Sequence, residues 1–314
     1  MINANALALL PVLRCPECKS GPLTQQNQRL VCPTCALSFE VTAKGVPILL
    51  SGRGKQHQTE QLTSDTGQAM VHEYQNYAAP DRAADAPSAA AKPWWHWLRP
   101  PSVHYDPNGD MRQVHTTRLF NHQGSDTLVL SVGGGPTRHR PNEITLNIEA
   151  FVNVDVVGDA HDIPLHDNSV DTVICNAVLE HVRDPYKVAS ELMRVLKPGG
   201  MLYVEMPFLF FFHGYPNDYT RFTREGLRRV FRTMDIQHIG ISGGPMSSLL
   251  QTANMVWLLL IPERWSKVRK LFSGVFRWMF FPFKYLDKWL QNLPQAHTVA
   301  AGFYLLARKP GDRT

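Results

Sequence analysis

The 314-residue chain contains no run of about eighteen apolar residues, the length that a membrane-spanning helix needs. Its opening stretch MINANALALLPVLRC has no basic lead-in and is interrupted by Pro11, so it lacks the pattern of a secretory signal. Cysteine is scarce, with five residues, so a disulfide-stapled secreted domain is not expected. These absences predict a cytoplasmic globular protein, long enough for one full α/β domain and a smaller one.

Four of the five cysteines pair by their spacing. Two CxxC turns are separated by thirteen residues, and their members are Cys15, Cys18, Cys32 and Cys35. Both sulfurs of a CxxC turn can converge on one ion, and four thiolates match the tetrahedral preference of zinc. We expect a structural zinc site in a ribbon over 10–50, with a short hairpin between 30–31 and 39–41. Two disulfides or unbound thiols are the alternatives. Cys175 lies in an apolar run and is expected in the core.

The richest pattern lies between residues 154 and 207. The runs 154–157 and 170–174 have the β-branched composition of buried parallel strands, and polar residues follow them at Asp159 and Asn176. A Lys-Pro-Gly-Gly turn at 197–200 then leads into a further strand. Ligands of open α/β sheets bind outside the carboxyl ends of the strands, so the polar residues mark an expected binding site.

This order of elements resembles the class I S-adenosylmethionine-dependent methyltransferases, with a methyltransferase-11-like domain. The ending KGVPILL makes 10–50 resemble the Trm112-like zinc ribbon, in which the ribbon is structural or binds a partner. The resemblance implies an α/β fold with a Rossmann-like sheet of seven strands, and S-adenosylmethionine as cofactor. An α/β domain with a degenerate site is the alternative.

The resemblance also implies which residues hold the cofactor. A glycine loop after the strand 128–130 faces the methionine and ribose portions, although Ser131 and Thr137 depart from the family pattern. Asn147 and Glu149 lie on one side of the next strand, and we favour Glu149 for the ribose hydroxyls. Asp159 would bind the adenine amino group, with capping of a turn as its alternative role. The implied cofactor residues are Gly133, Gly134, Gly135, Asn147, Glu149, Asp159, Ala160, Asn176 and Ala177.

Methyl transfer requires alignment of the acceptor and sometimes removal of a proton. Two clusters offer such groups: Glu180-His181, and the loop 213–223 beyond the strand 201–206. The residues expected to be catalytic are His213, Asp218 and His181, and those expected to bind the acceptor are Tyr219 and Arg221. The alternative role of Asp218 and Arg221 is to brace the loop, and Thr223 is expected to cap the helix 225–231. A similar Asp-x-x-Arg-Phe-Thr loop recurs in methyltransferases associated with surface-polysaccharide assembly.

The excess positive charge of the chain is local. Lys plus Arg exceed Asp plus Glu by 32 − 27 = 5, and the segment 262–290 alone carries seven basic and two acidic residues, 7 − 2 = 5. Apolar residues at 265, 268, 272, 275 and 279 have helical spacing, with Lys267, Lys270 and Arg277 on another face. This pattern is typical of an interfacial amphipathic helix, and an ordinary helical lid is the alternative. The segment 297–308 is expected to be the closing strand, so the basic helices form an insertion before it.

We therefore expect five segments. They are a zinc ribbon at 10–50, a linker at 51–110 with the Trp-rich stretch 94–98, a methyltransferase core at 111–245, a basic aromatic helical insertion at 246–294 and the closing strand at 295–310.

The expected activity is S-adenosylmethionine-dependent O-methylation of a saccharide or lipid-linked glycan intermediate. The expected partners are that acceptor and, through 246–290, the inner face of a membrane. A ribosomal-RNA methyltransferase with a zinc ribbon, or a non-catalytic scaffold, is the alternative, and nucleic acid is the less favoured partner. The sequence leaves the oligomeric state open.

Overall fold

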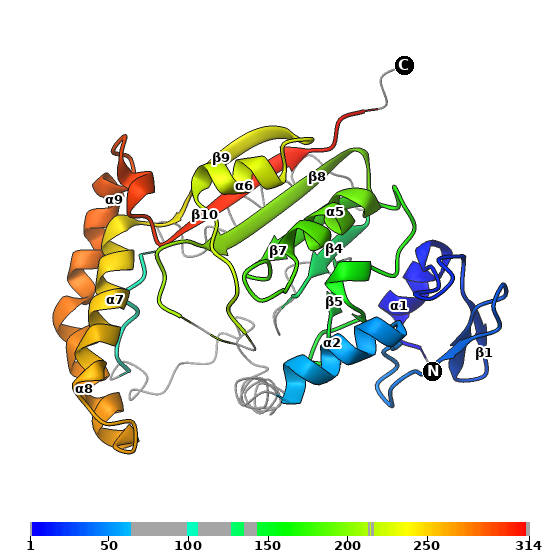
Figure 1. Ribbon diagram of the computed structural model, residues 1–314, viewed down its shortest axis with the longest axis horizontal. Coiled ribbons are helices and arrows are strands. Elements are labelled where there is room, and N and C mark those ends of the chain that lie inside the picture. Colours follow the sequence, from blue (N-terminus) through cyan, green and yellow to red (C-terminus); the bar gives the residue numbers. More distant parts are fainter. Residues whose placement is uncertain are drawn as a thin grey trace, which may run out of the picture.

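A computed structural model of the chain describes residues 2–63, 99–105, 127–134, 143–212, 214 and 217–311. Gly135, His213 and the Trp-rich stretch 94–98 lie outside the described residues. The main body is a sheet of seven strands in the order β6-β5-β4-β7-β8-β10-β9 (Figure 1). The strands are β4 (Val129–Val132), β5 (Glu143–Asn147), β6 (Val156–Val157), β7 (Val170–Asn176), β8 (Leu196–Pro207), β9 (Asp235–Gly243) and β10 (Gly302–Arg308).

The register of the strands fixes where a ligand can approach. β4, β5, β6, β7 and β8 run parallel to their neighbours, whereas β10 runs antiparallel between β8 and β9, with Leu305 opposite both Val204 and Ile239. The carboxyl ends of β4 to β7 consequently meet at one edge of the sheet. This topology confirms the expected Rossmann-like sheet, including its closing strand. That strand begins at Gly302, five residues later than expected, because Ala296–Thr298 form a 3₁₀ turn.

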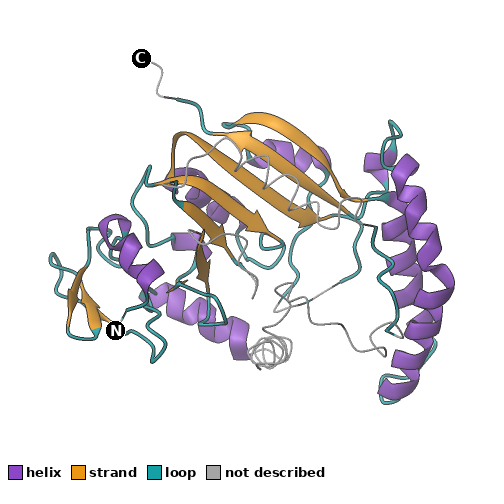
Figure 2. Ribbon diagram, turned by 180° about the vertical axis from the view of Figure 1, so that it is seen from behind, coloured by secondary structure: helices purple, strands orange, loops and turns teal. Residues whose placement is uncertain are grey.

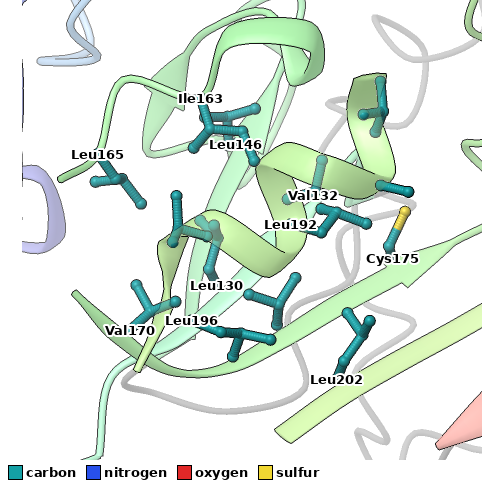
Figure 3. Close-up of a cluster of buried hydrophobic side chains, with 14 of the residues drawn as sticks. Leu130, Val132, Leu146, Ile163, Leu165, Val170, Cys175, Leu192, Leu196 and Leu202 are labelled. Carbon is teal, nitrogen blue, oxygen red and sulfur yellow. The ribbon is translucent and has the colours of Figure 1, made fainter. Parts of the chain in front are cut away.

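The core forms where helix α5 (Pro185–Val195) covers the parallel strands. Asp184 caps this helix by accepting a 2.9 Å hydrogen bond from the amide of Lys187, and Pro185 occupies its first turn. Val188 and Leu192 on its inner face are fully buried. Figure 3 shows Leu192 packed with apolar residues of the strands, such as Val132, and Cys175 lies among them as expected. Thr223 caps α6 (Arg224–Val230), also as expected.

The ribbon contains a three-stranded antiparallel sheet, β1 (Thr24–Gln26), β2 (Arg29–Val31) and β3 (Ser38–Phe39), after helix α1 (Ala4–Leu9). Leu30 pairs with Phe39 as expected, and β1 adds a strand that was not expected. The ribbon docks on the sheet through two isolated bridges, Leu13 with Leu165 and Ile48 with Val157 of β6. The second bridge is parallel, so the end of the ribbon extends the sheet beyond its β6 edge.

A helix follows the ribbon where the sequence predicted the start of a linker. α2 spans Gly52–Thr63, and the amide of Gly52 donates a 2.6 Å hydrogen bond to Oε1 of Glu17, inside the first CxxC turn. The glycines at 52 and 54 favoured a linker in the sequence, but tertiary contacts with the ribbon and the sheet outweigh this local preference.

The basic segment forms helices between β9 and β10, which confirms the expected insertion. They are α7 (Pro245–Leu259), α8 (Ser266–Phe280) and α9 (Asp287–Leu290), with 3₁₀ turns elsewhere at Leu10–Val12, Ala160–Asp162 and Phe281–Leu286. The ribbon and the α7–α8 hairpin lie at opposite ends of the sheet (Figures 1 and 2). Among the helices of the described residues, none combines the length and apolarity needed to cross a membrane.

Candidate functional site

The turn after β4 brings backbone close to the carboxyl edge of the sheet. Gly133 has φ +68°, and a Cβ atom there would lie 2.3 Å from Val178. A Cβ on Gly134 would lie 2.6 Å from Thr145 and 2.9 Å from Oγ of Ser131. Glycine is therefore required at both positions, and the loop presents bare backbone to whatever lies beyond the strand end.

The end of β5 separates the roles of Asn147 and Glu149. The Asn147 amide donates to the carbonyl of Gly134 (3.0 Å), and its oxygen accepts from the amide of Ile148 (2.7 Å). Asn147 therefore braces the glycine loop. Glu149 accepts from the amide of Ala150 and from Nε2 of Gln58 (3.1 Å). This difference favours Glu149 over Asn147 as the group available to a ligand.

Asp159 lies beyond β6 at the centre of a hydrogen-bonded cluster. His57 Nδ1 donates to its Oδ2, and His161 Nδ1 donates to its Oδ1, each at 2.7 Å. The carboxylate also accepts from the His161 amide at the start of the turn Ala160–Asp162. Burial raises the pKa of Asp159, but the hydrogen bonds and charge of His161 and the hydrogen bond of His57 outweigh it. The pKa therefore lies below its ordinary value and the group stays ionised.

These three side chains also place ligand-type atoms within 4.8 Å of one another, as a metal site would. Both histidines donate directly to the carboxylate, so the short spacing of the three side chains is explained without an ion.

The end of β7 carries an unusual polar atom. Oδ1 of Asn176 is buried and has no hydrogen-bond partner among the described residues. Ala177 follows with φ +51°, and its amide is held by the carbonyl of Glu205. A buried acceptor without a donor costs about 1–3 kcal/mol. The position therefore fits a ligand that brings its own donor to this edge of the sheet.

Glu180 and His181 lie just beyond β7. Burial raises the pKa of Glu180 to about 8; the charge of Arg221 lowers it, whereas Asp218 and Glu205 raise it further. Burial likewise lowers the pKa of His181, more than Asn217 and Asp218 raise it. His181 Nδ1 donates to the carbonyl of Asn217, and its Nε2 lies 3.8 Å from Glu180. That bond selects the neutral tautomer with its lone pair on Nε2.

The loop before α6 contains an ion pair. Arg221 binds Asp218 through both terminal nitrogens, and Asp218 is almost fully buried. The amide of Tyr219 donates to the carbonyl of Glu180 (2.7 Å), while its side chain is 48% exposed. The structure therefore brings Asp218 and Arg221 together in the bracing arrangement, next to the Glu180-His181 cluster.

The four paired cysteines converge in the ribbon. Cys15 Sγ lies 3.7 Å from Cys35 Sγ, and Cys18 Sγ lies 3.5 Å from Cys32 Sγ, with all four sulfurs within 4.8 Å of one another. Zn–S bonds of about 2.3 Å in a tetrahedron place sulfurs about 3.8 Å apart. No disulfide joins them. The donor set and its spacing fit a zinc ion.

Two residues at this edge, His57 and Gln58, were not predicted from the sequence. Both belong to α2, and Gln58 donates to the carbonyl of Ile148 (2.7 Å) as well as to Glu149. Their segment is polar and lacks the periodicity of a buried helix, so no sequence signal could have placed them there.

Comparisons with known proteins match two parts of the chain. A methyltransferase-domain family model matches residues 139–204, and a Trm112p-like family model matches residues 7–42. Demethylmenaquinone methyltransferase of Renibacterium salmoninarum is 45% identical over 49 residues, which are 16% of this chain and 21% of the relative. Thiol S-methyltransferase TMT1B of Rattus norvegicus is 54% identical over 39 residues, 12% of this chain and 16% of the relative. The chain thus spans about a fifth or less of the length of these curated relatives.

A solved structure resembles part of the chain. A chain of the complex that contains the Haloferax volcanii Trm112 methyltransferase activator is similar with a TM-score of 0.37 and 16% identity, covering 65% of this chain and 91% of that chain. The sequence matches and the observed strand order agree with each other. Residues 139–204 match the methyltransferase-domain family, and residues 7–42 match the Trm112p-like family.

Proposed function

We propose that the protein is a cytoplasmic S-adenosylmethionine-dependent methyltransferase that O-methylates a saccharide or a lipid-linked glycan intermediate. The observation that carries the proposal is the carboxyl edge of β4 to β7. Across the sheet, in the strand order β6-β5-β4-β7, this edge offers the Asp159 carboxylate, the Glu149 carboxylate, glycine backbone and the buried Asn176 oxygen. This is the order in which a nucleoside linked to an amino acid would present its base, its ribose and its amino-acid portion.

We propose a role for each group at this edge. Glu149 would accept from the ribose hydroxyls, Asp159 with Ala160 would bind the adenine, and Asn176 with Ala177 would meet the methionine portion. The glycine loop, with Gly135 as a further predicted member, would let that portion approach the backbone. S-adenosylmethionine, when bound, supplies a methyl group on a sulfonium sulfur.

Among the candidate bases, His181 is best suited to remove the proton from the acceptor hydroxyl. Its lowered pKa keeps the ring neutral at pH 7, and its tautomer leaves Nε2 as the proton acceptor. Asp218 is a weaker candidate because Arg221 already binds it. We read Arg221 as the support of the acceptor loop, with Tyr219 as its exposed contact. His213 stays a predicted base outside the described residues.

Two observations support a saccharide as the acceptor class, namely the sequence of the loop and the charge of the ribbon. The sequence Asp218-x-x-Arg221-Phe222-Thr223 is the one that resembles polysaccharide-associated methyltransferases. A ribosomal-RNA enzyme would need cations on its ribbon to bind phosphates. Arg14 and Lys19 instead form ion pairs with Asp162, and Arg14 lies close to Glu191 as well. Both cations are therefore neutralised by carboxylates of the protein and offer little charge to a phosphate. This favours the saccharide over RNA as the acceptor.

We propose in addition that a structural zinc ion occupies the four-cysteine site. About fifty residues bury little apolar surface by themselves, so a metal would supply much of the stability of the ribbon. Zinc would hold the first CxxC turn and, through Glu17, the start of α2.

The proposal is tested with methyl-labelled S-adenosylmethionine and host-cell lipid-glycan, nucleotide-sugar and RNA fractions. Label in a glycan or lipid fraction is the expected result, and label in RNA would replace the saccharide by the alternative. Calorimetry with the cofactor separates enzyme from scaffold. We expect Asp159→Ala to weaken binding by at least about tenfold, because it removes a buried charge-assisted hydrogen bond, while the exposed Asp235→Ala is the matched control. Absence of binding by the unmodified protein would support the scaffold.

A further inference from the structure

The amphipathic helix in the basic insertion has its apolar face turned outward. The side chains that form this face of α8 are Val268, Leu271, Phe272, Val275, Trp278 and Met279. They fall within one continuous arc of the helix, and Leu271, Val275 and Met279 are 65, 52 and 60% exposed. A surface helix of a globular protein normally turns such a stripe toward the core, so this face has no partner among the residues that the structure describes.

The outward orientation is fixed by the opposite side of α8. Arg269 donates to the carbonyls of Leu258 and Ile261 at the end of α7, at 2.8 and 2.7 Å. Arg277 donates to the carbonyls of Pro100 and Pro101, at 2.6 and 2.8 Å. The side of the helix that carries Arg269 and Arg277 therefore faces the protein, and the apolar side faces outward.

The root of the hairpin is anchored as well. Asp287 of α9 is fully buried and accepts from the amide of Met246, the amide of Ser247 and the hydroxyl of Ser247, at 2.7 to 2.9 Å. These bonds cap the start of α7. The hairpin is thus held rigidly at its base while its outer face stays exposed.

Helix α7 and the hairpin tip continue the apolar surface. The rings of Trp257 and Phe272 lie 6.3 Å apart and join the two helices. At the tip, Leu259 and Leu260 are both 77% exposed and Trp265 is 51% exposed. Beside α8, an open groove of about 740 Å³ is lined by Leu271, Val275 and Trp278, with Lys270 at its edge. A groove with an apolar floor and one cation suits an acyl chain and its anionic headgroup.

The exposed charges flank this surface rather than interrupt it. Of the seven cations in 262–290, Arg269, Arg277 and Lys284 bond to backbone carbonyls. The exposed ones are Arg264, Lys267, Lys270 and Lys288, against one exposed acid, Glu263, which leaves 4 − 1 = 3 positive charges. Lys267 and Lys270 lie on one flank of the α8 stripe. Cations beside bulky aliphatic and aromatic groups match a lipid interface, whereas a phosphate-binding nucleic-acid surface would carry cations within the face.

We propose that the outer face of the α7–α8 hairpin, together with its tip, binds the surface of an anionic lipid bilayer and inserts its apolar side chains between the headgroups. The helices are too short to span, so the attachment is peripheral. The proposal does not depend on methyl transfer. If the acceptor is lipid-linked, the enzyme would bind it at the same membrane surface.

The test is sedimentation of the full chain with vesicles of phosphatidylcholine, either alone or with about one third phosphatidylglycerol. We expect cosedimentation with the anionic vesicles at low salt and about tenfold weaker binding to the neutral ones. Leu271→Gln with Met279→Gln should reduce binding at least about tenfold, since two inserted apolar groups are lost. Leu37→Gln, at an exposed leucine of the ribbon, is its control.

Charge is tested with Lys267→Glu and Lys270→Glu, matched by Arg229→Glu and Arg232→Glu, which change net charge equally on a distant exposed surface. Only the first pair should abolish the preference for anionic vesicles. Circular dichroism checks that every variant is folded. Three outcomes would overturn the proposal: no vesicle binding by the unmodified chain, binding insensitive to Leu271 and Met279, or a sedimentation-equilibrium dimer that these two substitutions dissociate. Retention of RNA by the hairpin cations in place of vesicles would overturn it too.

Discussion

The ribbon and the α7–α8 hairpin lie at opposite ends of one sheet and differ in the burial of their apolar residues. The ribbon buries Leu13, Leu30 and Leu49 almost completely and pairs its backbone with Leu165 and Val157 of the domain. The hairpin is attached through buried polar contacts of Asp287, Arg269 and Arg277, and it exposes its apolar stripe. One appendage has become part of the core, whereas the other presents a surface.

The contrast shows that an amphipathic pattern identifies an interface but not its partner. For the ribbon the partner is the β6 edge and the segment after Asp159, which place it beside the proposed adenine site. For the hairpin no protein partner covers the stripe among the described residues. Experiments that treat the two appendages alike should therefore give unlike results.

The largest expected difference follows from removal of the metal. Cys15→Ser, or a zinc chelator, should unfold the ribbon, because structural zinc sites contribute about 10–16 kcal/mol in zinc-finger peptides. Amide exchange should then rise in 13–50 and in α2, with weaker cofactor binding, since α2 contacts Asp159 and Glu149. Vesicle binding through the hairpin should persist. Zinc content by mass spectrometry and exchange rates check the result, and unchanged exchange in α2 after zinc loss would contradict it.

A buried carboxyl between the two appendages gives a reference that depends on neither. Glu180 holds its proton up to a pKa of about 8 in the fold, whereas the unfolded chain releases it near 4.5. Wild-type stability should therefore fall between these pH values relative to Glu180→Gln, by about 1.4 kcal/mol per pH unit. Urea unfolding of the wild type and of Glu180→Gln at pH 5 and pH 8 measures how the difference in their unfolding free energies changes with pH. The exposed Glu225→Gln should show no such trend, and a pH-independent difference for Glu180→Gln would refute the assignment.

One buried leucine of the ribbon and one exposed leucine of the hairpin allow a direct comparison of unfolding free energies. Leu13→Ala in the ribbon should cost about 2–5 kcal/mol of unfolding free energy, because it opens a cavity at a fully buried position. Leu271→Ala on the hairpin, 65% exposed, should change it by no more than about 0.5 kcal/mol. Denaturant titration of both variants measures the two changes in unfolding free energy. A costly Leu271→Ala would mean that the stripe is covered.

The polar anchor of the hairpin should matter more than its apolar face. Asp287→Ala should lower the unfolding free energy by about 2 kcal/mol, since it leaves the α7 cap donors unsatisfied inside the protein. The ribbon should be unaffected. Hydrogen exchange of α7 and of β1–β3 in one experiment compares the two ends, and equal loosening of both would contradict a local anchor.

The smallest effect on cofactor binding is expected where α2 contacts the site. His57→Ala should weaken cofactor binding by about 1 kcal/mol, or roughly fivefold, by removing one of the hydrogen bonds that hold Asp159. His57→Gln, which keeps a donor, should recover part of the loss. Calorimetry measures both, and stronger binding by His57→Ala would instead indicate that His57 blocks the site.

Much of the molecule was determined by the sequence alone. The β-branched strands, the acids after them, the CxxC pairs and the insertion before the closing strand were all predicted, because each depends on residues near one another in the chain. The apolar stripe of α8 was visible for the same reason. Local periodicity and spacing are properties that a sequence displays without its fold.

The remaining features depend on contacts between segments that are distant in the sequence. The tertiary structure placed His57 and Gln58 of α2 against Asp159 and Glu149, about 90 to 100 positions away in the chain. It paired Arg221 with Asp218, although the sequence left that pair open as one of two roles. It also turned the stripe of α8 outward, because Arg269 and Arg277 found carbonyl partners on the inner side. Such contacts join segments distant in sequence, so their choice is made by the packing of the whole chain and not by any local pattern.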